Sequence, residues 1–228
     1  MELRLKSASN CVLIAGGLRM ADETHSWQRW QPWSPHDVAA FFAPLSAPWW
    51  IAGGWAIDLF LGQQTREHAD IDVQVLRRDQ QIVRALFDGW DMQAALQPPR
   101  DELWPFRALR SGEELDVAIH DVWCRPTPTE PWALQFMIAD SHDNEWLFRR
   151  IPTIRRPLAT IGCVTADGIP CLAPEIQLLY KAKRHRPKDA ADFTQALPML
   201  NRERRQWLRN ALTITHPQHP WLDSLTDS

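Results

Sequence analysis

The sequence is poor in the residues that mark several broad classes of protein. Its four cysteines form no CxxC pair and have no histidine at zinc-binding spacing. We therefore expect reduced thiols in a cytoplasmic protein, and neither a disulfide scaffold nor a zinc module. No apolar run approaches the roughly twenty residues that a membrane-spanning helix needs, so no membrane partner is expected.

An excess of charge of either sign is also lacking. The 25 basic and 28 acidic residues give a net charge of -3, which makes nucleic acid an unexpected partner. The mild acidic balance would suit a cationic ligand. Thirteen tryptophans stand against one tyrosine, and we expect most of them to pack in the core or to line a groove.

Three segments can be distinguished along the chain. Residues 1–26 are expected to be a disordered extension, because the apolar run "CVLIAGGL" is short and broken by glycines, and Met20 offers a second start. Residues 27–168 alternate short strands and helices. Residues 169–228 are expected to be a helical domain, since a proline-led amphipathic pattern follows Pro174.

Capping and turn residues divide the middle segment into short elements. Ser34-Pro35 begins a helix, and residues 49–52 predict a short buried strand. Gly53-Gly54 forms a turn before a helix that Gly62 ends. Further strands are predicted at 69–76, 104–109, 114–120, 132–138 and near 145–150, with a helix after Asp79 that turns Ile82, Val83, Leu86 and Phe87 inward.

This order of elements predicts an α+β fold. The strands of the middle segment are expected to form a mixed or antiparallel sheet flanked by helices. The last segment supplies three helices, within "EIQLLYKAKRH", "KDAADFTQAL" and "RERRQWLRNAL".

Two aspartates lie near the start of the strand predicted at 69–76. Asp70 and Asp72 lie two positions apart, so their side chains project from one face of the strand. A divalent cation with oxygen ligands would relieve the repulsion between them, and metals held this way can clamp the two oxygens of a phosphoryl displacement. A solvated strand face explains a lone DxD equally well.

The glycine pair just upstream favours the metal interpretation. Gly53-Gly54 lies between a strand and a helix, where backbone N–H groups and the helix dipole can hold a phosphate. A tight strand–helix turn is the alternative. Arg66 and His68 precede the two aspartates, and either could contact phosphate, although Arg66 could instead pair with a neighbouring carboxylate.

The stretch "GGWAIDLFLGQQTREHADID" resembles the small nucleotidyltransferases that inactivate antibiotics, especially the aminoglycoside 2''-nucleotidyltransferases and the lincosamide nucleotidyltransferases. These belong to the polymerase β-like superfamily. The specific match covers about residues 49–76, and a looser one extends to 114–121 and 172–193. The best-known members of the superfamily carry Gly-Ser where this chain has Gly53-Gly54, which leaves phosphate contacts to the backbone and to basic side chains.

The resemblance implies a third carboxylate on a neighbouring strand, as a metal ligand, a general base or both. The segment "ELDVAIHDVW" offers Asp116 and Asp121. Asp116 is our choice, because it follows an apolar residue in the middle of the predicted strand as the family's acid does. Asp121 lies on the opposite face of that strand.

The resemblance also implies a lysine that meets the triphosphate from a helix closing over the nucleotide. Lys181 in "APEIQLLYKAKRHRPKDAADF" is the candidate, and a solvated basic helix face is the alternative. Asp189 lies in the first turn of the next helix, where a carboxylate has a structural explanation.

Taken together, the resemblance implies a Mg²⁺-dependent enzyme that transfers a nucleotide, with ATP as the expected donor. Asp70, Asp72 and Asp116 would bind metal and act in catalysis. Gly53, Gly54, Arg66 and Lys181 would bind the nucleotide. The acceptor would be a hydroxyl of a small compound such as an aminoglycoside. Two alternatives stay open: a toxin-like enzyme that modifies tRNA or protein, and a nucleotide-binding protein without activity.

Overall fold

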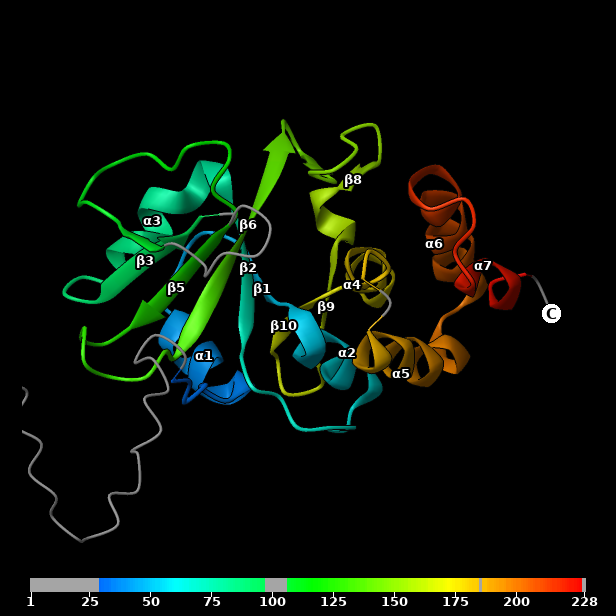
Figure 1. Ribbon diagram of the computed structural model, residues 1–228, viewed down its shortest axis with the longest axis horizontal. Coiled ribbons are helices and arrows are strands. Elements are labelled where there is room, and N and C mark those ends of the chain that lie inside the picture. Colours follow the sequence, from blue (N-terminus) through cyan, green and yellow to red (C-terminus); the bar gives the residue numbers. More distant parts are fainter. Residues whose placement is uncertain (1–28, 97–105, 185, 227–228) are drawn as a thin grey trace, which may run out of the picture.

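The computed structural model describes residues 29–96, 106–184 and 186–226, and these form a large mixed sheet with helices on both sides (Figure 1). The expected extension at 1–26 lies outside the described residues, as does the start of the strand predicted at 104–109. The strands run in the order β4-β3-β5-β6-β2-β1-β10-β9.

The centre of the sheet carries the strands that matter for function. β1 (Trp49–Ile51) is antiparallel to β2 (Asp72–Leu76), and β2 is parallel to β6 (Leu134–His142). β6 in turn is antiparallel to β5 (Asp121–Arg125). This pairing places Asp72 level with Trp123 and Gln74 level with Asp121, with only β6 between the two strands.

The remaining strands extend the sheet at both edges. β3 (Asp91–Ala95) and β4 (Phe106–Ala108) lie beyond β5. β10 (Pro170–Leu172) pairs parallel with β1, and β9 (Gly162–Val164) is antiparallel to β10. β7 (Glu145–Leu147) and β8 (Arg155–Pro157) form a short antiparallel pair attached to the end of β6. The mixed sheet of the predicted α+β fold is therefore confirmed.

The helices begin and end largely where the capping residues predict. α1 (Pro35–Phe42) starts with a capping box between Ser34 and Asp37. α2 (Gly53–Leu61) ends at Gly62, whose φ of 71° is the left-handed conformation that glycine adopts without strain. A 3₁₀ turn (Arg77–Asp79) leads into α3 (Gln80–Ala85).

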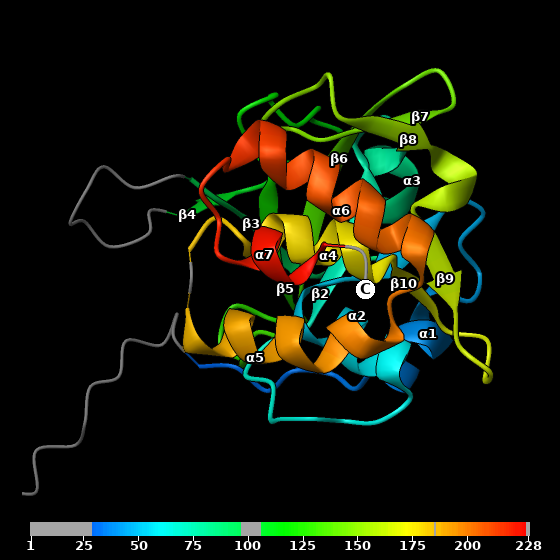
Figure 2. The ribbon, with the colours of Figure 1, turned by 90° about the vertical axis from the view of Figure 1, so that its right-hand side faces the viewer.

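The C-terminal helices form a layer over one part of the sheet (Figure 2). They are α4 (Pro174–Lys181), α5 (Pro187–Ala196), α6 (Arg202–Thr215) and α7 (Trp221–Ser224), with a 3₁₀ turn at Leu197–Met199 after α5. A further 3₁₀ turn, Leu158–Thr160, lies between β8 and β9. Asn201 caps α6 through its side chain, which accepts from the Arg204 N–H. None of the helices in the described part of the chain is both long and apolar enough to span a bilayer.

Two hydrophobic clusters hold these layers together. One packs α1, α3 and the inward side chains of β2, β5 and β6. The other joins α2 and the β7 region to α4, α5, α6 and α7. The expected domain boundary at 168 falls between β9 and β10, which pair within one sheet, so the division into two domains stays a prediction.

The prediction of a strand at 114–120 is wrong. Leu115, Val117 and Ile119 alternate as in a strand, but Val117 is 75% exposed because the segment is a turn that precedes β5. Buried Leu115 and Ile119 anchor the turn, and the N–H of Leu115 donates to Gln80 Oε1 at 2.7 Å. The inward face predicted for α3 is also partly wrong, since Ile82 is exposed whereas Val83 and Phe87 are buried.

Candidate active site

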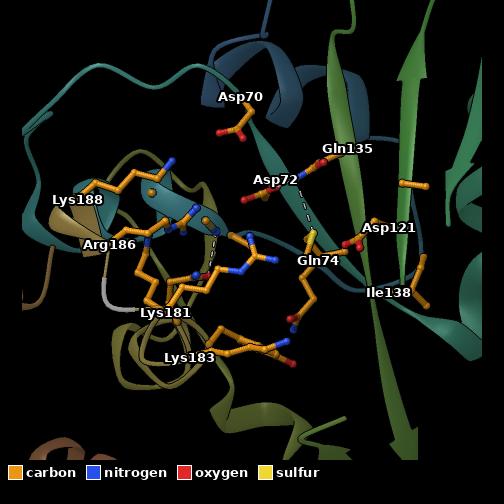
Figure 3. Close-up of a pocket in the computed structure, with 18 of the residues that line it drawn as sticks. Asp70, Asp72, Gln74, Asp121, Gln135, Ile138, Lys181, Lys183, Arg186 and Lys188 are labelled. Carbon is orange, nitrogen blue, oxygen red and sulfur yellow. Dashed lines mark hydrogen bonds between the residues drawn. The ribbon is translucent and has the colours of Figure 1, made fainter. Parts of the chain in front are cut away.

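A cavity of about 380 Å³ opens where β2, β5 and β6 meet the start of α2 and the turn between α4 and α5 (Figure 3). Its wall contains the two predicted aspartates at and just before the start of β2, the glycine pair, Arg66 and Lys181. Six of the seven predicted site residues therefore lie together. Segments more than 100 residues apart in the sequence build this site.

Asp70 and Asp72 both line the cavity, as the alternation of the strand predicts. Between and after them, Ile71 and Val73 are fully buried on the opposite side of the chain. Gln74 continues the polar row and also lines the cavity. The core thus fixes which way the aspartates point.

Asp72 is electrostatically strained. Burial raises the pKa of its carboxyl to about 7, and the negative charges of Asp70 and Asp121 add to this shift. The amide nitrogen of Gln135, its register partner on β6, donates a hydrogen bond to Asp72 and opposes the shift, as does Lys181. The site therefore accumulates negative charge that a bound cation would stabilise.

The third carboxylate of the cavity is Asp121, and Asp116 does not reach it. Asp116 lies in the exposed turn before β5, where its Oδ1 accepts a hydrogen bond from Ala118 N at 2.8 Å. Asp121 is the first residue of β5 and lines the cavity. Burial raises the pKa of Asp121, against the opposing charges of Arg149 and Arg184. The strand begins at 121 and not at 114 as expected, and the carboxylate that lines the cavity lies five residues after the predicted one.

The glycine pair begins α2 where neighbouring side chains leave no room for a Cβ atom unless they move. Gly53 has a φ of 66°, and a Cβ at this position would collide with the Asp72 carboxylate. A Cβ on Gly54 would collide with Arg66 and His68. The Gly53 N–H donates to Gln177 Oε1 at 2.9 Å.

Arg66 and Lys181 reach the cavity already paired with one carboxylate of α5. Asp192, 1% exposed, accepts from Arg66 Nε at 2.9 Å and lies 2.7 Å from Lys181 Nζ. Asp189 lies 3.5 Å from Lys181 Nζ and accepts from Arg186 Nε at 2.7 Å. The neighbouring cations outweigh the effect of burial and lower the pKa of Asp192. Asp189 lies in the first turn of α5, as expected.

The side chain of His68 is held by contacts within the protein. Its Nε2 lies 2.6 Å from Asp58 Oδ2, its ring packs on Trp55 at 4.4 Å between centroids, and burial lowers its pKa. Asp58 also accepts from Thr65 at 2.5 Å. These contacts hold the loop that leads from α2 to Asp70.

Three polar residues that contact the site were not predicted from the sequence. Gln135 on β6 contacts Asp72, Gln177 on α4 contacts Gly53, and Asp192 on α5 contacts Arg66 and Lys181. Only Asp192 has a local signal, because it lies three residues after Asp189 on the same helix face. The two glutamines depend on pairings between distant segments.

The donor set suits a hard divalent cation. The two carboxylates of Asp70 and Asp72 and a third carboxylate in the same cavity are oxygen ligands of the kind that Mg²⁺ prefers. Within residues 29–96, 106–184 and 186–226, no three His, Cys, Asp or Glu side chains converge closely enough to form a complete site. Asp70 and Asp72 are therefore the residues that fit a metal best, with Asp121 beside them.

The aminoglycoside-2''-adenylyltransferase family matches residues 36–195, which is more than half of the chain. A lincosamide resistance protein of Staphylococcus haemolyticus is 34% identical over 68 residues, 29% of this chain and 42% of that protein. A 2''-aminoglycoside nucleotidyltransferase of Klebsiella pneumoniae is 50% identical over 38 residues, 17% of this chain and 22% of that protein. The aligned part thus spans less than half the length of these curated relatives.

Solved structures agree with this fold. The crystal structure of ANT(2")-Ia in complex with adenylyl-2"-tobramycin has a TM-score of 0.51 and 22% sequence identity, covering 79% of this chain and 95% of that one. The solution structure of antibiotic-resistance factor ANT(2'')-Ia has the same score and identity, covering 80% and 90%. At this identity the likeness concerns the fold.

Proposed function

This chain belongs to the aminoglycoside-2''-adenylyltransferase family, and on that premise we propose that it transfers a nucleotide from a nucleoside triphosphate to a hydroxyl group of a small acceptor. The observation that carries the proposal is the meeting of Asp70, Asp72 and Asp121 with Gly53-Gly54 in one cavity. The curated relatives, a lincosamide resistance protein and 2''-aminoglycoside nucleotidyltransferases, support the same reaction class.

The donor phosphates would lie at the start of α2. The open first turn of the helix and the cations Arg66 and Lys181 make this corner suited to an anion. Asp192 holds both cations in place and limits their net charge. ATP is the donor that the family description supports.

Asp70 and Asp72 would hold Mg²⁺. When bound, the ion neutralises charge on the phosphates and stabilises the developing charge of the leaving group. Gln135 orients Asp72 by donating to it. The raised pKa of Asp72 supports a bound metal at this site, because the carboxylate is costly to ionise without a positive partner.

Asp121 would act as the general base. Its raised pKa makes it a better proton acceptor than an ordinary aspartate. It takes the proton of the acceptor hydroxyl as that oxygen forms a bond to the α-phosphorus. The bond from the α-phosphorus to the bridging oxygen breaks, and pyrophosphate leaves.

The test follows pyrophosphate release and acceptor mass with Mg²⁺, each nucleoside triphosphate, and panels of aminoglycosides and lincosamides. We expect a mass increase of one nucleotide and loss of binding of the Mg²⁺-bound triphosphate in Asp70→Asn/Asp72→Asn. Asp88→Asn, at an exposed position outside the cavity, is the matched control. Normal triphosphate binding in the double variant would refute the proposal.

A further inference from the structure

One wall of the cavity carries a cluster of four cations, Arg149, Arg150, Lys183 and Arg184, which we name the cationic cluster. Arg149 and Arg150 follow β7, and Lys183 and Arg184 follow α4. Lys183 and Arg184 are exposed, whereas both arginines after β7 are half-buried. In Figure 3, Lys183 lies below Arg186 and Lys188, and all three lie to the left of Asp121 in the view.

The cationic cluster differs from three of the other four cations of the cavity because none of its members has an acidic partner among the described residues, a feature that it shares with Lys188. Arg66, Lys181 and Arg186 are all paired with Asp189 or Asp192. None of the cluster's four side chains forms an ion pair with any part of the chain that the structure describes. Arg150 has only a 3.4 Å contact with the Tyr180 carbonyl and lies over the Phe148 and Tyr180 rings.

The four cations repel one another. Arg150 is the main cause of a lowered pKa at Lys183, with burial, Arg184 and Arg149 adding to it. Burial, followed by Arg149, lowers the pKa of Arg150. Because these unpaired cations line one cavity, binding of an anion among them would relieve their mutual repulsion.

The cationic cluster lies on the side of the cavity where the acceptor would bind. Arg149 and Arg184 act on the carboxylate of Asp121, whereas Arg66 and Arg186 act with Asp70. Trp123, two residues after Asp121 on the same strand, also lines the cavity. Asp121, Trp123 and the cluster thus surround the place of the attacking hydroxyl.

A bound nucleoside triphosphate alone would not neutralise the positive charge of the cavity. Eight cations line the cavity, against Asp70, Asp72, Asp121 and the two aspartates of α5. With a fully ionised triphosphate and one divalent cation added, the positive charges still exceed the negative ones. A polycationic aminosugar would therefore meet net repulsion beside Asp121.

We propose that the acceptor is a phosphate-bearing hydroxyl compound that docks on Arg149, Arg150, Lys183 and Arg184 beside Asp121. This inference rests on the proposed nucleotide transfer and specifies its substrate class. The phosphate can belong to a small sugar phosphate or to the 3'-terminal nucleotide of an oligonucleotide, and the two sources share the recognition chemistry. Trp123 offers an aromatic surface to a sugar or base in either case.

The test measures binding of three probes to the metal-free full chain by isothermal calorimetry: ribose 5-phosphate, a short single-stranded oligoribonucleotide with a free 3'-hydroxyl, and tobramycin. We expect at least one phosphate probe to bind more tightly than tobramycin, and its affinity to fall with salt. Lys183→Glu/Arg184→Glu should weaken that probe about tenfold or more. Arg29→Glu/Arg209→Glu makes the same charge change at exposed positions outside the cavity and should leave the affinity unchanged.

Two outcomes would overturn the inference. One is tighter binding of tobramycin than of both phosphate probes. The other is a charge reversal that leaves the phosphate probes unaffected but abolishes binding of the Mg²⁺-bound triphosphate, which would assign the cationic cluster to the donor. Donor binding that depends on Asp70 and Asp72 is measured in parallel, so the proposed transfer can stand while the acceptor class fails.

Discussion

At the scale of single residues, the choice between Asp116 and Asp121 is the most direct test of the site. Asp121→Asn removes the proposed base while keeping the shape of the side chain, so we expect the turnover rate to fall about 10²–10⁴-fold. Asp116→Asn changes an exposed turn outside the cavity and should change the rate less than about threefold. Pyrophosphate release measures both variants. An inactive Asp116→Asn beside a fully active Asp121→Asn would reverse the assignment.

The Asp72→Asn variant is expected to be more stable than the wild type, by an amount that depends on pH. Its pKa is raised from 3.8 to about 7 in the folded protein, so between these values the folded state keeps a proton that the unfolded state loses. The folded state is therefore destabilised as the pH rises through this window. Asp72→Asn avoids that cost, and we expect the metal-free variant to unfold with a free energy about 1–2 kcal/mol higher at pH 8.

Urea unfolding in the presence of a chelator measures this effect. The difference between Asp72→Asn and the wild type should be close to zero at pH 4 and should grow up to about pH 7. Equal stability of the two proteins at pH 8 would mean that the ionised carboxylate is well solvated. Added Mg²⁺ should stabilise the wild type and leave the variant unchanged.

At the scale of secondary-structure elements, α5 anchors the loop between α2 and β2. Asp192 of α5 is buried and holds both Arg66 of that loop and Lys181 of α4. Asp192→Ala would leave two cations with one less partner in a cavity wall, and we expect a loss of about 3 kcal/mol in the free energy of unfolding. Chemical denaturation checks it, with Asp88→Ala as the exposed control; a loss below about 1 kcal/mol would contradict a buried ionic anchor.

The same scale shows which elements a sequence alone can locate. β1, α2 and β2 are marked locally, by Gly53, by Gly62 and by an alternation whose apolar positions are all buried. The turn before β5 has the same alternation of apolar residues as a strand, because Leu115 and Ile119 are buried at its two ends. Only the pairing of β5 with β6, where Asp121 faces Met137, identifies the true strand. Such pairing between distant segments leaves no local pattern.

At the scale of the whole molecule, the net charge conceals how charge is distributed. A value of -3 argues against an anionic partner, yet the structure gathers eight cations around one cavity. Their source segments, around 66, 149–150 and 181–188, are separated in the sequence, and each looks like an ordinary solvated charge group there. A total over the chain cannot report such a concentration, because acids elsewhere on the surface cancel it.

The two halves of the chain are tied together well enough that they should unfold as one unit. β10 pairs with β1, and Glu175 of α4 accepts from both Arg156 of β8 and Arg204 of α6. We expect fragment 27–168 to lack a cooperative transition, because removing β10 and α4 opens the sheet beside β1 and exposes the apolar face of α2. Circular dichroism and tryptophan fluorescence should give coincident curves for the full chain. A fragment that melts cooperatively on its own would instead support two independent domains meeting at 168.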